Sequence, residues 1–236
     1  RAVLRSAAQL AAEGSGRLVL LGGEAGIGKT ALVRDLASGL AGGCFRVITG
    51  HCFDLTNTGP YAPWLEIVRR SSDDTWPVVP EAFRDGQLGR VSDQTRLVLQ
   101  TRQFLEELAT KQPLVVVLED VHWADPSSVE LLRSLTPHLE QASILVVATY
   151  RVDEMDGEQA FSRHLPALVR SGATLHVEIG RLEKHHLREL IQSQYTLPND
   201  DLIRLVSYLD RNAEGVPFFA VELLHALEAD GLLRRG

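Results

Sequence analysis

The chain has 236 residues, of which 44% are hydrophobic and 23% charged, and a formal net charge of −7 at pH 7. This is ordinary globular usage, and no apolar run approaches the ~20 residues that span a bilayer. The basic residues are scattered, which makes nucleic acid a poor partner because phosphate neutralisation dominates such affinity. We expect a cytoplasmic protein that contacts neither membrane nor nucleic acid. Since the chain starts at Arg1 and its one methionine is Met155, we also expect a fragment of a larger protein.

The first predicted elements are a buried strand over residues 17–21 and an amphipathic helix over residues 31–40. Between them, residues 23–30 read GEAGIGKT and fit the phosphate-binding pattern GxxxxGK[ST]. In such a strand-to-helix turn, successive backbone N–H groups surround a phosphate, and the helix N-terminus adds about half a positive charge. We interpret the segment as a phosphate loop rather than an incidental glycine-rich turn.

Three residue types in this loop have separate tasks. Its glycines permit the left-handed or closely approached backbone that a phosphate nest needs. Lys29 is expected to reach the β- and γ-phosphates, and the Thr30 hydroxyl to ligate Mg²⁺. The predicted nucleotide-binding residues are Gly23, Glu24, Ala25, Gly26, Ile27, Gly28, Lys29, Thr30 and Ala31.

The middle of the chain continues the alternation of strands and helices. A second strand is predicted over residues 45–49, a helix with one apolar face follows, and a third strand occupies residues 114–118. The stretches 59–63 and 71–90 show weak periodicity and are interpreted as insertions between these strands. The third strand reads LVVVL, and a strand apolar at every position is expected to be covered by helices on both faces.

Two adjacent carboxylates, Glu119 and Asp120, end the third strand. A sheet core rejects isolated charges, so these acids are expected at the C-terminal edge, where open α/β sheets bind ligands. In a nucleotidase with a phosphate loop, one acid holds Mg²⁺, usually through water, and the other activates the attacking water. We assign Glu119 to the metal and Asp120 to the general base; a pair of solvated strand-end acids is the alternative.

The next helix is expected to begin at Asp125, which can cap its N–H groups ahead of Pro126. The fourth strand, residues 144–149, brings Arg151 to the same edge of the sheet. An arginine there can sense the γ-phosphate and stabilise charge that develops on it. Pairing of Arg151 with the nearby Asp153 or Glu154 is an equally good interpretation from spacing alone.

A fifth strand is predicted over residues 174–179, and only helical patterns follow it. We therefore predict an α/β fold with a parallel sheet over residues 1–180 and a helical lid subdomain over residues 181–236. In the lid, Pro217 lies at the start of the last helix. Phe218 and Phe219 are expected to pack in a core rather than to stack on a base.

Four motifs together resemble the STAND class of signal-transduction ATPases. The likeness is to the nucleotide-binding part of large LuxR-type bacterial transcription regulators and of adenylate-cyclase-linked ATPases, and it covers nearly the whole chain. It rests on GEAGIGKT, on LVVVLEDVHWADPSS at residues 114–128, on TYR at 149–151 and on EGVPFFAVELL at 214–224. Many members of the class have Asp where this chain has Glu119, so the division of labour between the two acids stays open.

The resemblance implies that the ligand is ATP or ADP with Mg²⁺. The preference for adenine comes from the resemblance alone, since it does not follow from the residues. It implies a P-loop NTPase with five parallel strands in ASCE-type order, in which the fourth strand separates the third from the first. The implied site consists of the phosphate loop with the catalytic Lys29, the Walker B acids Glu119 and Asp120, the sensor Arg151, and a GxP element, Gly215 and Pro217, that lies against the base.

We expect an ATP-dependent regulatory switch, a slow ATPase that acts with other domains of its parent chain and forms nucleotide-dependent homo-oligomers. ATP would favour an open, oligomerising state and ADP a closed one, which requires contacts that differ between the two states. The alternatives are a small-molecule kinase, a cyclase-linked ATPase module and a nucleotide-binding scaffold without turnover. Phosphate release without a phosphorylated acceptor separates the switch from the kinase.

Overall fold

The structure, a computed structural model, describes residues 1–41, 45–54, 59–69, 77–83 and 94–234. The chain divides into two compact units. The first contains residues 1–22 and 30–178, and the second contains residues 23–29 and 179–236. The phosphate loop is therefore grouped with the C-terminal helices and not with the sheet. Among the described helices, none combines the length and the apolar character needed to cross a membrane.

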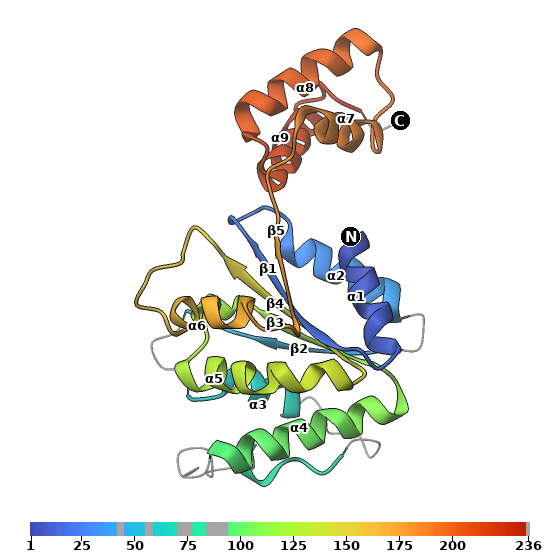
Figure 1. The fold of residues 1–236 in the computed structure, drawn as a ribbon. Helices are drawn as coiled ribbons and strands as arrows, with labels where there is room; N and C mark the ends of the chain where they lie inside the picture. The colour runs from blue at the N-terminus through green and yellow to red at the C-terminus, as the bar shows by residue number, and fades with distance from the viewer. Residues whose placement is uncertain (42–44, 55–58, 70–76, 84–93, 235–236) are drawn as a thin grey trace. The chain divides into compact units, whose positions relative to one another are not determined.

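The first unit is built on a five-stranded parallel sheet with the strand order β2-β3-β4-β1-β5 (Figure 1). All five predicted strands are present, and β4 lies between β3 and β1 as predicted, which is the order of a P-loop NTPase. Because all strands run the same way, their C-terminal ends meet at one edge. The strands are β1 (Arg17–Gly23), β2 (Arg46–His51), β3 (Leu114–Glu119), β4 (Ile144–Arg151) and β5 (Thr174–Glu178).

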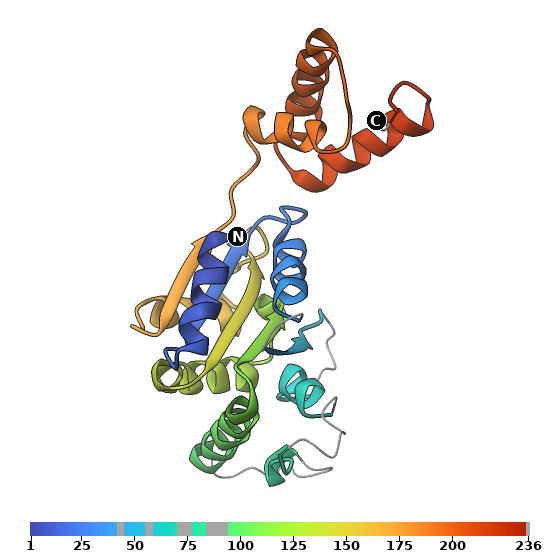
Figure 2. The same ribbon diagram turned by 90° about the vertical axis from the view of Figure 1, so that its right-hand side faces the viewer.

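Helices cover both faces of this sheet (Figures 1 and 2). On one face lie α1 (Ala2–Ala12) and α2 (Lys29–Ala41). On the other lie α3 (Ala62–Arg69), α4 (Gln94–Lys111), α5 (Pro126–Leu135) and α6 (Ala160–Val169), with α5 in contact with the other three. Consequently β3 and β4 are buried along their whole length except at the last residue, as their continuous apolar sequences predict. Among the described residues the unit also contains short 3₁₀ helices, η1 (Glu81–Phe83), η3 (Val121–Trp123) and η4 (Thr136–Gln141).

Helix α3 begins inside a stretch that the sequence analysis interpreted as an irregular insertion. It packs on β2, where the carbonyl of Pro63 comes so close to Gly50 that an added Cβ would lie 2.3 Å from its oxygen. Trp64 and Ile67 are 2% and 1% exposed. A helix of eight residues gives too short a periodic pattern to be recognised without its tertiary contacts.

The second unit contains a three-helix lid, α7 (Lys184–Gln192), α8 (Asn199–Ala213) and α9 (Pro217–Ala229). These helices share a core of their own, which includes Leu187, Leu209 and Leu224. The prediction that Phe218 and Phe219 pack in a core is wrong, because they are 55% and 53% exposed. The core-facing positions of α9 are instead Ala220 and Leu224, one helical turn apart.

Candidate nucleotide-binding site

The phosphate loop has the backbone shape that the sequence predicts. Gly26 and Gly28 have φ angles of 72° and 100°, in the region that L side chains rarely adopt. The loop runs directly into the N-terminus of α2, which begins at Lys29. The Lys29 side chain is 7% exposed, and its Nζ donates to the carbonyl oxygens of Gly23 at 2.8 Å and Glu24 at 2.9 Å. The ammonium group is thus held against the loop's own backbone.

These features fit a bound polyphosphate. No heavy atom lies within 4 Å of a Cβ added at Gly28, so the space beside that backbone is open. The helix N-terminus favours an anion, and the Lys29 ammonium can exchange neutral carbonyl acceptors for a charged one. Thr30 and Ala31 form the first turn of α2 and belong to the first unit. Thr30 supplies a hydroxyl oxygen, a donor type that suits Mg²⁺.

The loop is tied to the lid by two polar contacts within the second unit. The backbone N–H of Phe218, in the first turn of α9, donates to the carbonyl of Gly26 at 3.2 Å. The Arg181 guanidinium donates to the Glu24 carboxylate at 2.8 and 3.0 Å, and this hydrogen bond raises the pKa of Arg181. Loop and lid are therefore parts of one packed body.

The turn between α8 and α9 also depends on a close approach. Gly215 has a φ angle of 76°, and a Cβ there would lie 2.6 Å from the carbonyl oxygen of Leu182. The amide of Leu182 in turn donates to the carbonyl of Gly215 at 2.7 Å. Pro217 follows at the first helical position, where its missing N–H is not needed. The backbone of this turn therefore requires a glycine at 215, and the helix start accommodates a proline at 217.

At the C-terminal edge of the sheet, Asp120 adopts a left-handed backbone conformation, with φ 57° and ψ 47°. Such a conformation is uncommon outside glycine and occurs often at functional sites. Its amide donates to the hydroxyl of Thr149 on the neighbouring β4 at 3.0 Å. Glu119 is the last residue of β3 and is partly buried. No described side chain pairs with its carboxylate, so Glu119 remains available to a metal ion or its water.

Arg151 lies at the same edge, surrounded by acidic and aromatic groups. Its Nε is 4.0 Å from a carboxylate oxygen of Asp120, and an N–H of its guanidinium donates to Glu154. The guanidinium carbon is 5.1 Å from the centre of the Trp123 ring, within range of a cation–π contact. Of the two interpretations left open by the sequence, pairing with Glu154 is present in this structure, and placement beside the Walker B acid is present as well.

A buried histidine shares the Glu154 carboxylate with Arg151. The Nε2 of His122 lies 3.2 Å from Glu154, and the His122 side chain is fully buried. Burial lowers the pKa of the imidazole, against the opposing influence of Asp120 and Glu154. His122 is therefore neutral at neutral pH, and its Nδ1 has no hydrogen-bond partner among the residues described.

The helix that follows begins as predicted. The Asp125 carboxylate accepts a hydrogen bond from the amide of Ser128 at 3.0 Å, and Pro126 is the first helical residue. Asp125 also accepts from the amide of Tyr61 at 3.2 Å, which ties the start of α3 to this cap. Cys52 is a buried free thiol, and burial raises its pKa.

Sequence reasoning missed two contributors to this region. The Arg181–Glu24 pair joins residues 157 positions apart, and no spacing pattern signals such a contact. The sequence indicates Glu154 only as a local partner of Arg151. In the structure Glu154 also contacts the buried His122 and so bridges the two side chains.

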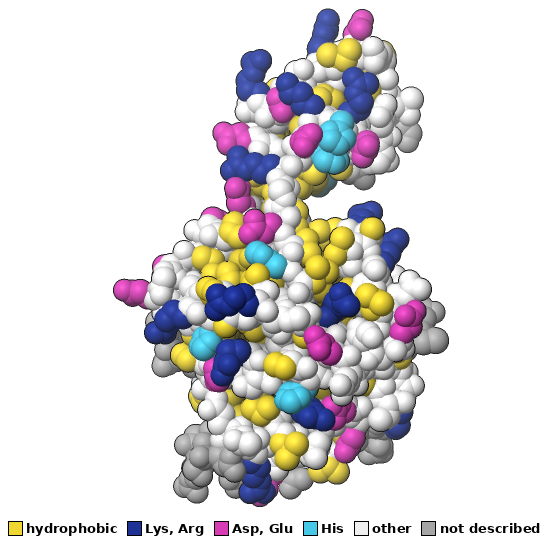
Figure 3. Space-filling model, in the orientation of Figure 1, with side chains coloured by type: hydrophobic (Ala, Val, Ile, Leu, Met, Phe, Trp, Pro, Cys, Tyr) yellow, Lys and Arg dark blue, Asp and Glu magenta, His cyan; other side chains and the backbone are white. Residues whose placement is uncertain are grey.

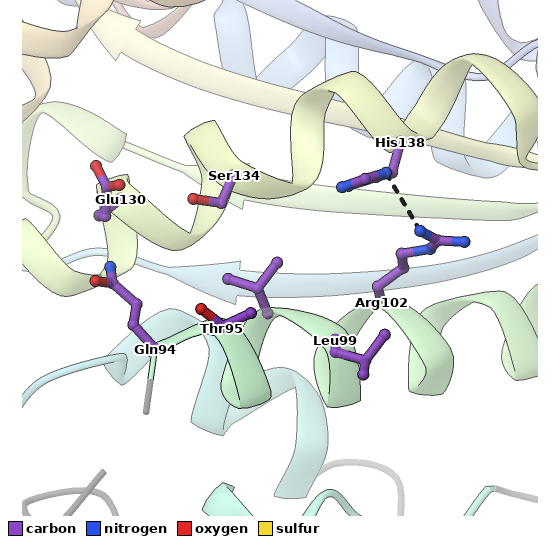
Figure 4. Close-up of a pocket in the computed structure, with 8 residues that line it drawn as sticks. Gln94, Thr95, Leu99, Arg102, Glu130, Ser134 and His138 are labelled. Carbon is purple, nitrogen blue, oxygen red and sulfur yellow. Dashed lines mark hydrogen bonds between the residues drawn. The ribbon is translucent and has the colours of Figure 1, made fainter. Parts of the chain in front are cut away.

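A separate groove of about 540 Å³ lies between α4 and the α5–η4 segment of the first unit (Figure 4). In the close-up, Arg102 and His138 point toward each other across it and are joined by a hydrogen bond of 3.3 Å. None of the predicted site residues lines this groove, so it is distinct from the candidate nucleotide site. On the face drawn in Figure 3, basic side chains are dispersed among acidic and apolar ones in each unit.

A model of the AAA ATPase domain family matches residues 1–147. The chain belongs to this family. As an AAA ATPase domain it is a nucleotide-binding module, and the match includes residues 23–30 as well as Glu119 and Asp120. The match ends inside β4, ahead of Arg151 and the lid.

No curated protein matches the chain. A chain from the structure of Drosophila ORC bound to GC-rich DNA and Cdc6 is similar, with 12% sequence identity and a TM-score of 0.45. The similarity covers 86% of this chain and 73% of that one. A likeness of this size carries no functional information.

Proposed function

We propose that this AAA ATPase domain is the ATP-binding, slowly hydrolysing switch module of a multidomain cytoplasmic signalling protein. Within that class we favour a LuxR-type transcriptional regulator of the STAND group, because the four sequence motifs resemble that group over nearly the whole chain. The observation that carries the proposal is the packing of the phosphate loop with the lid, through Gly26 and Phe218 and through Glu24 and Arg181. A ligand on the loop thereby acts on the helices.

Each predicted site residue has a role in this proposal. The loop amides and Lys29 bind the phosphates, and Thr30 and Glu119 hold Mg²⁺, the latter through water. A Mg²⁺ ion held by these residues would supply charge neutralisation on the phosphate oxygens. Asp120 accepts the proton of a water whose oxygen attacks the γ-phosphorus, while the bond from that phosphorus to the oxygen of ADP breaks. Pro217 lies against the base.

Arg151 is the candidate source of the difference between ATP and ADP. Its guanidinium donates to Glu154 and lies near Asp120. A γ-phosphate offers it a competing anion that ADP lacks, and a ligand shifts a two-state equilibrium only through such a difference in contacts. Other domains of the parent chain and homo-oligomer formation would respond to the resulting state.

The test compares ATP·Mg²⁺ and ADP·Mg²⁺ binding to the wild type and to Arg151→Ala by calorimetry. We expect the variant to lose about tenfold or more in ATP affinity, the value of a hydrogen bond to a charged group, and little in ADP affinity. Arg133→Ala is the matched control, because Arg133 also pairs with a glutamate three residues away but lies on α5. Equal losses for ATP and ADP would rule out the sensing role. No rise in melting temperature with saturating nucleotide would contradict nucleotide binding altogether.

A further inference from the structure

We propose that the Phe218 ring is the stacking surface for the nucleotide base. This inference rests on the proposed function, since it assumes that the loop binds the phosphates. On this proposal Phe218 recognises the flat aromatic face that all bases share and does not distinguish one base from another. The resemblance assigns contact with the base to Pro217 only, and the sequence alone favoured a core position for Phe218.

The position of Phe218 relative to the loop carries the inference. Its backbone N–H donates to the carbonyl of Gly26, and its Cβ would lie 2.9 Å from a Cβ added at Gly26. The aromatic side chain therefore starts at the left-handed bend of the phosphate loop. A base is one sugar away from the α-phosphate, so a ring attached at this bend is suited to meet the base while the loop holds the phosphates.

The exposure of the ring points to a ligand. Phe218 is 55% exposed, although the lid has a well-packed core close by. An exposed phenylalanine costs hydrophobic free energy that burial against a ligand recovers. The loop also cannot cover the ring from its own residues at this point, because Gly26 has no side chain. A glycine is needed there in any case, since the φ angle is 72°.

Phe219 lies next to Phe218 but does not share its position at the loop. The two rings are 5.6 Å apart and inclined at 65°, an edge-to-face arrangement. Consecutive residues on a helix point about 100° apart, so Phe219 does not approach Gly26 in the same way. Only Phe218 is in contact with the loop through its backbone. We therefore assign the stacking to Phe218 and no role in base binding to Phe219.

The experiment separates the base from the phosphates. Binding of ATP, ADP and inorganic triphosphate, each with Mg²⁺, is measured for the wild type and for Phe218→Leu, which keeps an apolar side chain but removes the aromatic face. Base–aromatic stacking is worth enough for about a tenfold effect. We expect ATP and ADP to bind about tenfold more weakly, and triphosphate to bind within about twofold of the wild type.

Phe219→Leu is the matched control, because Phe219 is equally exposed and adjacent in sequence. It should change ATP affinity by about twofold or less. Phe218→Trp gives a second readout: it should retain ATP binding and quench the emission of bound ethenoadenosine triphosphate. Melting temperatures of the variants without ligand confirm that each one is folded.

Three outcomes would overturn the assignment. Unchanged ATP affinity in Phe218→Leu removes the stacking role. An equal loss for ATP and triphosphate means that Phe218 only shapes the loop. An equal loss in Phe219→Leu means that general lid hydrophobicity is responsible. If the wild type binds none of the three ligands, the proposed function fails instead, and the two failures are thereby distinguished.

Discussion

Two regions differ in how their candidate functional groups are held. One is the C-terminal edge of the sheet around Glu119, Asp120 and Arg151, which we call the acid edge. The other is the loop–lid body, formed by residues 23–29 and 179–236. At the acid edge, Asp120 is fixed by a hydrogen bond from its amide to the buried Thr149, and Glu154 is shared with the buried His122. In the loop–lid body, the Arg181–Glu24 pair is exposed and the Phe218–Gly26 contact is a single backbone hydrogen bond. Exposed pairs of this kind contribute little to stability.

This difference suggests a division of labour. Groups that handle water and the γ-phosphate need a fixed geometry, and neighbouring strands provide it. Contacts that respond to a ligand must break and form at low cost, and elements that move are drawn from the weakly held part of a protein. If the comparison is correct, substitutions in the two regions will have different effects on turnover, binding and stability.

The largest expected effect is the loss of nucleotide binding in Lys29→Ala. Removing a buried ammonium that contacts a phosphate leaves the anion without its partner, which costs at least about 100-fold in affinity. Calorimetry with ATP·Mg²⁺ measures it. Lys184→Ala is the control, because that lysine is exposed on the lid and pairs with Asp210. Wild-type affinity in Lys29→Ala would remove the phosphate-loop hypothesis.

Asp120→Asn should separate turnover from binding. An amide cannot accept the proton of the attacking water, so we expect turnover in the longer parent protein to fall by about 100-fold or more, while ATP affinity stays close to that of the wild type. Phosphate release provides the measurement, with Asp153→Asn as an exposed acidic control nearby. Unchanged turnover would show that Asp120 is not the base and would favour the scaffold without hydrolysis.

The smallest expected effects are changes in stability caused by substitutions at two glycines, one in the lid turn and one in α2. Gly215→Ala forces a side chain into a left-handed conformation and against the Leu182 carbonyl, so the lid should lose about 1–3 kcal/mol in its free energy of unfolding. Gly39→Ala has open space within α2, and it should gain about 0.5–1 kcal/mol. Chemical denaturation followed by circular dichroism checks both. A gain in Gly215→Ala would contradict the close packing of the lid turn.

Much of the sheet and of the phosphate loop could be predicted because their signals are local. The continuous apolar runs of β3 and β4 indicate strands buried on both faces, and GEAGIGKT predicts both the loop and its position between strand and helix. The acids at 119 and 120 follow from the same logic, since charges can leave a buried strand only at its end. These inferences need only the nearest neighbours in the sequence.

The remaining features depended on residues that are distant in sequence. Helix α3 is stabilised by burial on β2, and an eight-residue pattern is too weak to indicate it. The exposure of Phe218 could not be inferred from its apolar side chain, because burial depends on which helical face meets the core. Arg151 could equally sense phosphate or pair with a local acid until Asp120 and Glu154 were placed around it.

The sequence by itself therefore determined the five strands and the phosphate loop, because hydrophobic periodicity and backbone freedom are properties of short segments. Only the tertiary structure decided that the loop packs with the lid, which faces of α9 are buried, and which groups surround Arg151. Those features arise from contacts between segments separated by many residues, and such contacts leave no periodic pattern in the chain.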